Sequence, residues 1–298
     1  MYHRIGNTAF DPWGLAVEEA QFDAQLRWLA RNRDVMPLGE FARRHRERRV
    51  GRDALSITFD DGYSSVLERA VPILERHGLT ATLFLPAECI ERGREFWWDE
   101  LARIIIGFPS DRLKLGRSTL PVPAPTEHDG TWAPDAPPST PRQALFHSIW
   151  QRFRLKRPQD LENAMAGLRS QADGIGAPSD APLTPAELKA MRSPVIEFGS
   201  HALTHSSLPR LGAKERAREI AQSRERCKAL TGEMPRTFAY PYGDHGPSDA
   251  RLVEDAGYVC AVTTDPAFVK AGIDCYSLPR MAVGNWPASK LRNRLRGR

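Results

Sequence analysis

The feature that most constrains the fold is an alternation of short apolar segments with amphipathic helical segments. It appears over residues 54–90 and again from residue 194 onward. Apolar strands that alternate with helices are typical of parallel sheets, because a helix carries the chain back to start the next strand. The chain has 298 residues, which suits one α/β barrel of roughly 200 to 300 residues. We therefore expect an α/β fold in a single domain over residues 1–298.

The same pattern assigns most of the chain to particular elements. Strands are expected at residues 54–59, 80–85, 195–199, 237–240 and 258–263, and near 276–283. Helices are expected over 17–45, with a second short helix over 38–48, then in the segment closed by Gly78, and over 142–154, 185–191, 213–230 and 248–256. Thr184 is the expected N-cap of the helix that starts at Pro185.

Periodicity weakens between residues 91 and 190. Prolines and glycines dominate 116–141 and recur over 172–185. These residues interrupt helices and strands and favour turns. We therefore predict that about 91–190 is a partly irregular insertion in the core fold.

Polar residues stand at the ends of four expected strands. They are Asp60-Asp61, Ser200-His201, Pro241-Tyr242 and Pro279-Arg280. The carboxyl ends of parallel strands in a barrel share one face, and active sites are built on that face. This placement predicts that the four groups meet in one site.

The pair Asp60-Asp61 follows an apolar strand and precedes Gly62. Two adjacent carboxylates near a core resist joint ionisation, and a metal cation removes that cost for one of them. The other carboxylate is then available as a base. The competing interpretation is a simple turn, which Asp and Gly also favour.

His201 and His205 are four positions apart, which places both imidazoles on one face if the segment is a helical turn. Two histidines and one carboxylate suit zinc or another divalent transition metal and leave positions for water and substrate. Packing or surface histidines are the alternative. The segment Tyr240-Pro241-Tyr242-Gly243 predicts a sharp turn whose backbone N–H at Tyr242 faces an oxyanion, with a bare turn as the alternative.

Taken together, Thr58-Phe59-Asp60-Asp61-Gly62-Tyr63, His201-x-x-x-His205 and Tyr240-Pro241-Tyr242-Gly243 resemble the motifs of the polysaccharide deacetylase family. This is the family of the NodB homology domain, carbohydrate esterase family 4. The resemblance covers about 54–90 and 194–284. It implies a distorted (β/α) barrel of seven or eight parallel strands. It also implies removal of N-acetyl, or alternatively O-acetyl, groups from a glycan or glycolipid in cell-envelope or exopolysaccharide metabolism.

The resemblance also implies a role for each residue. Asp61, His201 and His205 bind the metal, usually zinc. Asp60 is the base that activates a metal-bound water, and the backbone at Tyr242 helps to hold the oxyanion. Such a metal polarises the carbonyl and lowers the pKa of its water.

Two positions depart from the family pattern. The family usually has an arginine where this chain has Ala239, and a histidine acid where this chain has Arg280. We expect Arg280 to pair with Asp60 in place of the missing arginine. We expect His3, within a short apolar start that suits the first strand of the barrel, to supply the acid. A disordered chain end is the alternative for His3.

Two rival functions follow from the same sequence. The two departures favour a degenerate glycan-binding module. The intact base and metal positions argue against it. The net charge of +5 and the arginines at 43–52 and 292–298 suggest a nucleic-acid-binding protein, but they lack interleaved aromatic residues. A solvated helix face and a frayed tail are the simpler explanation of these arginines, so we expect no nucleic-acid partner.

The remaining composition indicates a chain without covalent cross-links or a membrane anchor. The four cysteines have no CxxC spacing, and Cys227 and Cys260 stand in apolar stretches typical of buried thiols. The first residues lack the apolar core of a signal peptide, and no stretch reaches the roughly 18 apolar residues of a membrane span. We therefore expect a cytoplasmic protein. The sequence gives no indication of the oligomeric state.

Overall fold

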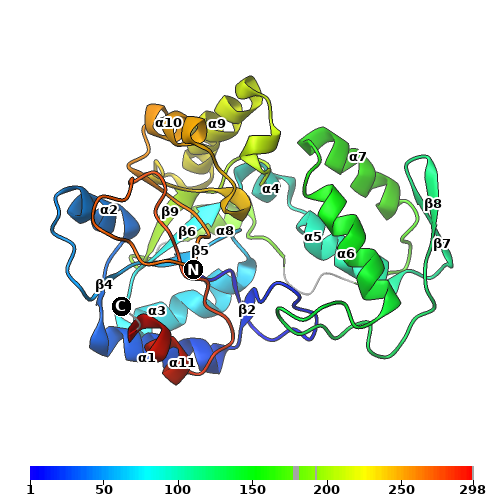
Figure 1. Cartoon of the computed structure of the whole chain (residues 1–298), viewed down its shortest axis with the longest axis horizontal. Coiled ribbons are helices and arrows are strands. Elements are labelled where there is room, and N and C mark those ends of the chain that lie inside the picture. The colour runs from blue at the N-terminus through cyan, green and yellow to red at the C-terminus, as the bar shows by residue number, and fades with distance from the viewer. Residues whose placement is uncertain (177–180, 192, 297–298) are drawn as a thin grey trace. The chain divides into compact units, whose positions relative to one another are not determined.

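The structure is a computed structural model that describes residues 1–176, 181–191 and 193–296 (Figure 1). The chain divides into two compact units. The first unit consists of residues 1–7, 15–93 and 182–298, and the second of residues 8–14 and 94–181. Parts of two sequence predictions, at 177–180 in the proline-rich stretch and at Arg298, lie outside the described residues.

A five-stranded parallel sheet forms the centre of the first unit. Its spatial order is β11-β10-β9-β6-β5, and every neighbouring pair is parallel. The strands are β5 (Ile57–Phe59), β6 (Ala81–Leu85), β9 (Ile196–Ser200), β10 (Thr237–Ala239) and β11 (Cys260–Val262). Each strand is buried along nearly its whole length, as expected for a parallel sheet covered on both faces.

Two further extended segments curl this sheet into a distorted barrel. Tyr2 forms a parallel bridge to Phe59 at one edge, and Leu278 forms a parallel bridge to Val262 at the other. The two added segments then meet, because the backbone N–H of Val283 donates to the carbonyl of Met1 at 3.0 Å. The predicted α/β fold with a distorted barrel is therefore confirmed.

Helices and short paired strands surround the barrel strands (Figure 1). Before β9 these are β1 (Arg4–Ile5), β2 (Ala16–Val17), α1 (Glu19–Asn32), β3 (Asp34–Val35), α2 (Leu38–Arg46), β4 (Ala54–Leu55), η1 (Val66–Ala70), α3 (Val71–His77), α4 (Ala87–Arg92) and α8 (Pro185–Ala190). After β9 they are η2 (Leu208–Arg210), α9 (Ala213–Thr231), η3 (Pro241–Gly243), α10 (Pro247–Asp255) and α11 (Ala288–Arg296). Thr184 caps α8 as predicted, since its hydroxyl accepts a hydrogen bond from the N–H of Glu187.

Two sequence predictions need correction in this unit. The helical pattern over 17–45 is wrong in part, because Val17 belongs to β2 and the chain is extended at Asp34–Val35. Pro37 explains the break, since the residue before a proline is disfavoured in the helical region. The second short helix, predicted over 38–48, is confirmed as α2. The strand expected near 276–283 is reduced to the bridge at Leu278. Pro279 follows directly and has no N–H to donate to a ladder.

The second unit is more regular than the sequence indicated. Within 94–181 lie α5 (Trp97–Gly107), the antiparallel hairpin β7 (Arg112–Leu115) and β8 (Ser118–Pro121), α6 (Pro141–Phe153) and α7 (Pro158–Arg169). Only α6 was predicted. The unit has its own apolar core, in which Ile104, Phe146 and Leu168 are buried. The proline and glycine content of this segment therefore did not predict its packed structure.

The state of the cysteines and the character of the helices agree with what the sequence predicts. All four cysteines are free thiols, and the predicted burial of Cys227 and Cys260 is confirmed. Among the described residues, no helix has the length and apolar character needed to cross a bilayer.

Candidate active site

The four polar groups at the strand ends come together in the first unit. Asp60 follows β5 and forms two hydrogen bonds with Arg280, which lies beyond Leu278. His201 follows β9, and its ring is 4.8 Å from that of His205. The His205 ring is in turn 4.7 Å from the ring of Tyr242, in the turn after β10. The carboxyl ends of the barrel strands therefore form one continuous polar site.

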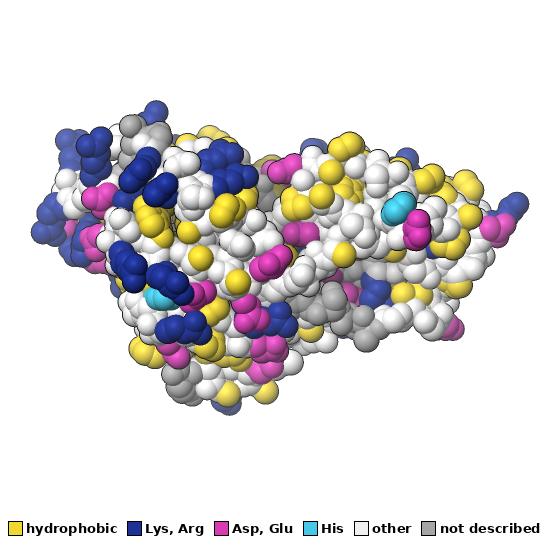
Figure 2. Space-filling view, turned by 90° about the horizontal axis from the view of Figure 1, so that it is seen from below, with side chains coloured by type: hydrophobic (Ala, Val, Ile, Leu, Met, Phe, Trp, Pro, Cys, Tyr) yellow, Lys and Arg dark blue, Asp and Glu magenta, His cyan; other side chains and the backbone are white. Residues whose placement is uncertain are grey.

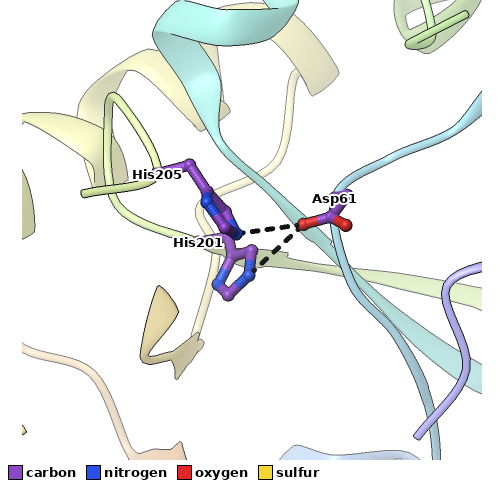
Figure 3. A group of neighbouring side chains, drawn as sticks. All are labelled: Asp61, His201 and His205. Carbon is purple, nitrogen blue, oxygen red and sulfur yellow. Dashed lines mark ion pairs between the residues drawn. The ribbon is translucent and has the colours of Figure 1, made fainter. Parts of the chain in front are cut away.

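Asp61, His201 and His205 converge within this site (Figure 3). The Oδ1 atom of Asp61 lies 3.2 Å from Nε2 of His205 and 3.6 Å from Nε2 of His201. One ligand atom from each residue lies within 4.8 Å of the other two, and all three side chains are buried. This arrangement offers one carboxylate oxygen and two imidazole nitrogens to a single ion.

The chemistry of these three groups fits a divalent metal. The Oδ1 atom of Asp61 is buried and accepts no hydrogen bond from the described part of the chain. Burial lowers the pKa of His201 and of His205 to about 4, so both rings are neutral near pH 7. Neutral imidazoles are the form that binds a metal. Burial also raises the pKa of Asp61, a cost that a bound cation would relieve.

A backbone carbonyl fixes the tautomer of His201. The Nδ1 atom of its ring lies 2.8 Å from the carbonyl oxygen of Ala239, which can only accept a hydrogen bond. The proton is therefore on Nδ1, and the lone pair on Nε2 faces Asp61. Ala239, which stands where the family usually has an arginine, thus orients the His201 ring through its backbone carbonyl.

The histidines do not lie on a helical turn, so that part of the sequence prediction is wrong. His201 directly follows β9, and the loop after it has left-handed backbone at Ala202 (φ 61°) and His205 (φ 56°). Asp61 (φ 73°) and Tyr242 (φ 60°) share this conformation. Such conformations cost non-glycine residues about 1–3 kcal/mol each and cluster at functional sites.

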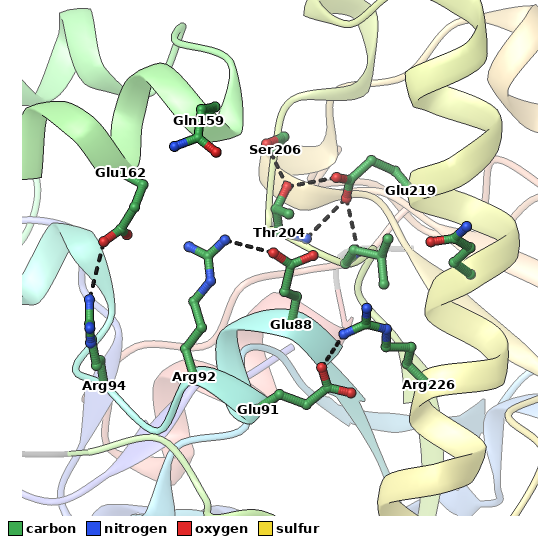
Figure 4. Close-up of polar contacts among 12 residues, drawn as sticks. Glu88, Glu91, Arg92, Arg94, Gln159, Glu162, Thr204, Ser206, Glu219 and Arg226 are labelled. Carbon is green, nitrogen blue, oxygen red and sulfur yellow. Dashed lines mark hydrogen bonds and ion pairs between the residues drawn. The ribbon is translucent and has the colours of Figure 1, made fainter.

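A buried carboxylate holds the loop between the two histidines (Figure 4). Glu219 of α9 accepts hydrogen bonds from the backbone N–H groups of Leu203 and Thr204, at 2.9 and 3.0 Å. It also accepts one from the Thr204 hydroxyl at 2.8 Å, and that hydroxyl contacts Ser206. The sequence analysis did not identify Glu219. Its only sequence signal is an acidic residue in the apolar phase of an amphipathic helix.

Asp60 is held by Arg280 in a two-point contact. The Nη1 and Nη2 atoms of Arg280 each lie 2.7 Å from one Asp60 oxygen, so the predicted contact is present. Arg280 is itself fixed, because it donates from Nε to the carbonyl of Thr263 and from Nη1 to the hydroxyl of Thr58. Burial alone would raise the pKa of Asp60, but the charge and the hydrogen bonds of Arg280 hold this pKa far below its usual range.

His3 lies in the same electrostatic environment. It interacts with Asp61, Asp60, Arg280 and His201. Burial lowers the pKa of His3, while the two carboxylates oppose that shift. The neighbouring Tyr2 is bridged to β5, so this segment is an ordered part of the barrel.

Comparison with known proteins agrees with this geometry. The profile of the family described as Polysaccharide deacetylase matches residues 47–106 and 163–261, which is more than half of the chain. The chain belongs to the polysaccharide deacetylase family. The core barrel of this family member is therefore the NodB-type deacetylase domain that the motifs indicated.

Individual relatives are distant but extend over most of the chain. YxkH of Bacillus subtilis (strain 168), named as a candidate polysaccharide deacetylase, is 21% identical over 95% of this chain and 70% of its own length. The Streptococcus pyogenes deacetylase PplD, solved in complex with acetate, has a TM-score of 0.62 at 16% identity, covering 99% of this chain and 96% of its own. The polysaccharide deacetylase BC0361 of Bacillus cereus has a TM-score of 0.60 at 18% identity, covering 99% and 67%. These structures share the fold of the family member described here.

Proposed function

We propose that this family member is a metal-dependent deacetylase that removes N-acetyl groups from a carbohydrate. The observation that carries the proposal is the placement of Asp60, held by Arg280, beside the converging ligand atoms of Asp61, His201 and His205. A base and a metal-ligand set side by side are the two parts that hydrolysis of an amide by water requires. The alternative, a degenerate glycan-binding module, explains neither the oriented base nor the set of metal ligands.

Asp61, His201 and His205 would hold a divalent transition metal, with zinc favoured by their N and O donors. Such an ion, when bound, polarises a carbonyl and makes water more acidic. Asp60 accepts the proton of the attacking water, which its depressed pKa permits at neutral pH because the carboxylate is ionised. Arg280 keeps that carboxylate in one orientation through its two hydrogen bonds.

Two further groups complete the proposed mechanism. The backbone N–H of Tyr242 stabilises the negative charge that develops on the acetyl oxygen. His3 donates the proton to the leaving amine, because it is the imidazole beside Asp60 and Asp61 that is outside the proposed ligand set. Its lowered pKa makes the protonated ring a stronger acid toward that amine.

The substrate class follows from the family and from a neighbour's bound product. PplD, whose fold is similar, was solved with acetate, the product expected from a deacetylase. We infer that the substrate here is an N-acetylated glycan or glycolipid of cell-envelope or exopolysaccharide metabolism.

The decisive experiment is mass spectrometry of a panel of N-acetylhexosamine oligosaccharides, incubated with the purified protein. We expect loss of one acetyl mass per reacted sugar, abolished by chelation and restored by adding a divalent metal. An O-acetylated panel run in parallel separates ester from amide cleavage. Tight glycan binding without acetate release would favour the binding module instead.

A further inference from the structure

The first unit contains a mostly apolar cavity of about 330 Å³ that borders the site described above at Thr58 and Arg280. Its walls come from α1, α2, α11, the segment 50–58 and the segments around 267–271 and 278–283. Asp60, Asp61, His201 and His205 are not among its lining residues. Binding cavities for small molecules begin at about this volume.

The lining of this cavity combines two chemical characters. Most of the wall is apolar. It includes leucines from three helices and the half-buried side chains of Val50, Leu55 and Val269. The ionisable side chains among the described lining residues are three arginines and one histidine, and none is Asp or Glu. An apolar interior with only positive groups complements a molecule that has an apolar body and an anionic end.

Arg48 is the clearest cation of this set. It is exposed, lines the cavity, and has left-handed backbone with φ 56°. Neighbouring arginines behave differently: Arg43 pairs with Glu40 and Glu47, and Arg49 pairs with Glu47. Within the described ranges, no ion pair involves Arg48. Figure 2 shows Lys and Arg side chains gathered on the surface of the first unit with apolar side chains between them.

A layer of fixed polar side chains stands between the cavity and the catalytic carboxylate. Thr58 and Arg280 line the cavity, and the guanidinium of Arg280 is already bound to Thr58, Thr263 and Asp60. The charge of Arg280 is therefore neutralised internally. An anionic ligand in the cavity would find its counter-charge at Arg48 instead.

We propose that this cavity binds one single-chain anionic amphiphile, with its alkyl chain among the leucines and its head group at Arg48. The chemistry required is a linear hydrocarbon tail that ends in a phosphate or carboxylate. Burial of each methylene group strengthens binding about fourfold until the cavity is full. The head group adds an electrostatic part that salt screens.

The test is calorimetric titration of the purified, chelated full chain with monomeric alkyl phosphates from hexyl to dodecyl at low ionic strength. Chelation removes metal-dependent binding of the head group at His201 and His205. We expect one site per chain, affinity that rises about fourfold per methylene and then levels off, and no binding of inorganic phosphate. Decanol and decylammonium should bind at least about tenfold more weakly than decyl phosphate.

Variants locate the site. Val269→Trp and Leu55→Trp fill the cavity and should abolish binding, with folding checked by circular dichroism. Arg48→Glu should weaken binding about tenfold at low salt and less at high salt, whereas the matched control Arg49→Glu should change it less than twofold. If both tryptophan variants misfold, the Arg48–Arg49 pair and the head-group series still decide the question.

Three outcomes would overturn the proposal. They are affinity independent of chain length, equal binding of decanol and decyl phosphate, and binding seen only above the micelle concentration. The assay contains no acetylated sugar, so its result is independent of the proposed deacetylase activity.

Discussion

Asp60 and Asp61 are neighbours in sequence, yet their carboxylates lie in opposite environments. Burial tends to raise the pKa of both. At Asp60 the guanidinium of Arg280 outweighs burial, and the pKa is depressed. At Asp61 burial outweighs the nearby positive charges, which include the more weakly acting Arg4, and the pKa is raised. The protein itself thus keeps Asp60 ionised, whereas burial favours the protonated form of Asp61.

The backbone produces this difference within one peptide unit. Asp60 directly follows the buried strand β5, and its N–H donates a hydrogen bond to the carbonyl of Tyr2. Asp61 has φ 73° and Gly62 has φ 79°, so the chain turns sharply after the strand. A Cβ on Gly62 would come within 2.7 Å of Leu85, which explains the glycine. The two halves of the site, the Asp60–Arg280 pair and the Asp61–histidine group, can therefore be altered one at a time.

The largest effect should come from Asp61→Asn. This change removes the anionic ligand between His201 and His205, so we expect the metal content to fall from about one ion per chain to a trace. Turnover should fall by more than about 10⁴, since the ion and the water that Asp60 activates are lost together. Elemental analysis and acetate release measure the two effects. Full metal content in this variant would contradict the assignment.

Asp60→Asn should distinguish the role of Asp60 from that of its neighbour Asp61. The amide keeps the shape of the side chain but cannot accept a proton, so turnover should fall about 10²–10⁴-fold. Metal content should equal that of the wild type, because Asp60 is outside the proposed ligand set. A rate close to that of the wild type would mean that another group is the base.

Arg280→Lys should have an intermediate effect. Lysine keeps the charge but cannot make the two parallel hydrogen bonds to Asp60. We expect kcat to fall about 10–100-fold with little change in KM and in metal content. The acid limb of the pH–rate profile should move to higher pH as Asp60 becomes easier to protonate. Loss of metal in this variant would show that the two halves are not independent.

Much of the barrel and the site could be predicted from local sequence. Each regular barrel strand is a short apolar run, and the polar residues that follow β5, β9 and β10 mark the active face because parallel strands share direction. The contact between Arg280 and Asp60 could be predicted because Arg280 stands at a strand end and the usual arginine is absent at Ala239.

Other features depend on contacts that a local pattern does not record. The positive φ angles of Ala202 and His205 arise from a loop held by Glu219, which is 14 residues away from His205 in sequence. The hairpin β7–β8 and α7 lie in a segment rich in turn-forming residues, and a core that includes Phe146 and Leu168 stabilises that unit. Tertiary packing overrides weak local preference in both regions.

Glu219→Gln tests whether the loop geometry serves the histidine half of the site. The variant keeps the size of the side chain but loses the charge that accepts bonds from Leu203 and Thr204. We expect metal affinity to fall about tenfold, measured by competition with a chelating dye. Glu225→Gln, an exposed change on the same helix, is the matched control and should leave the affinity unchanged.

The smallest effect is a difference in how the two halves respond to acid in the metal-free protein. The histidines have folded pKa values of about 4, below the usual 6.5, so the unfolded chain binds more protons between these values. Their contribution to stability is therefore complete above about pH 6.5 and is lost as the pH falls toward 4, at roughly 1 kcal/mol per pH unit for each ring. Asp60 also has a depressed pKa, but its contribution is lost only below about pH 4. Urea unfolding from pH 7 to pH 4 should show a decline that is smaller in His205→Asn, because one of the buried rings is removed, and that is not reduced in Asp60→Asn. An equal slope in the wild type and in His205→Asn would show that the histidine is not buried as a neutral ring.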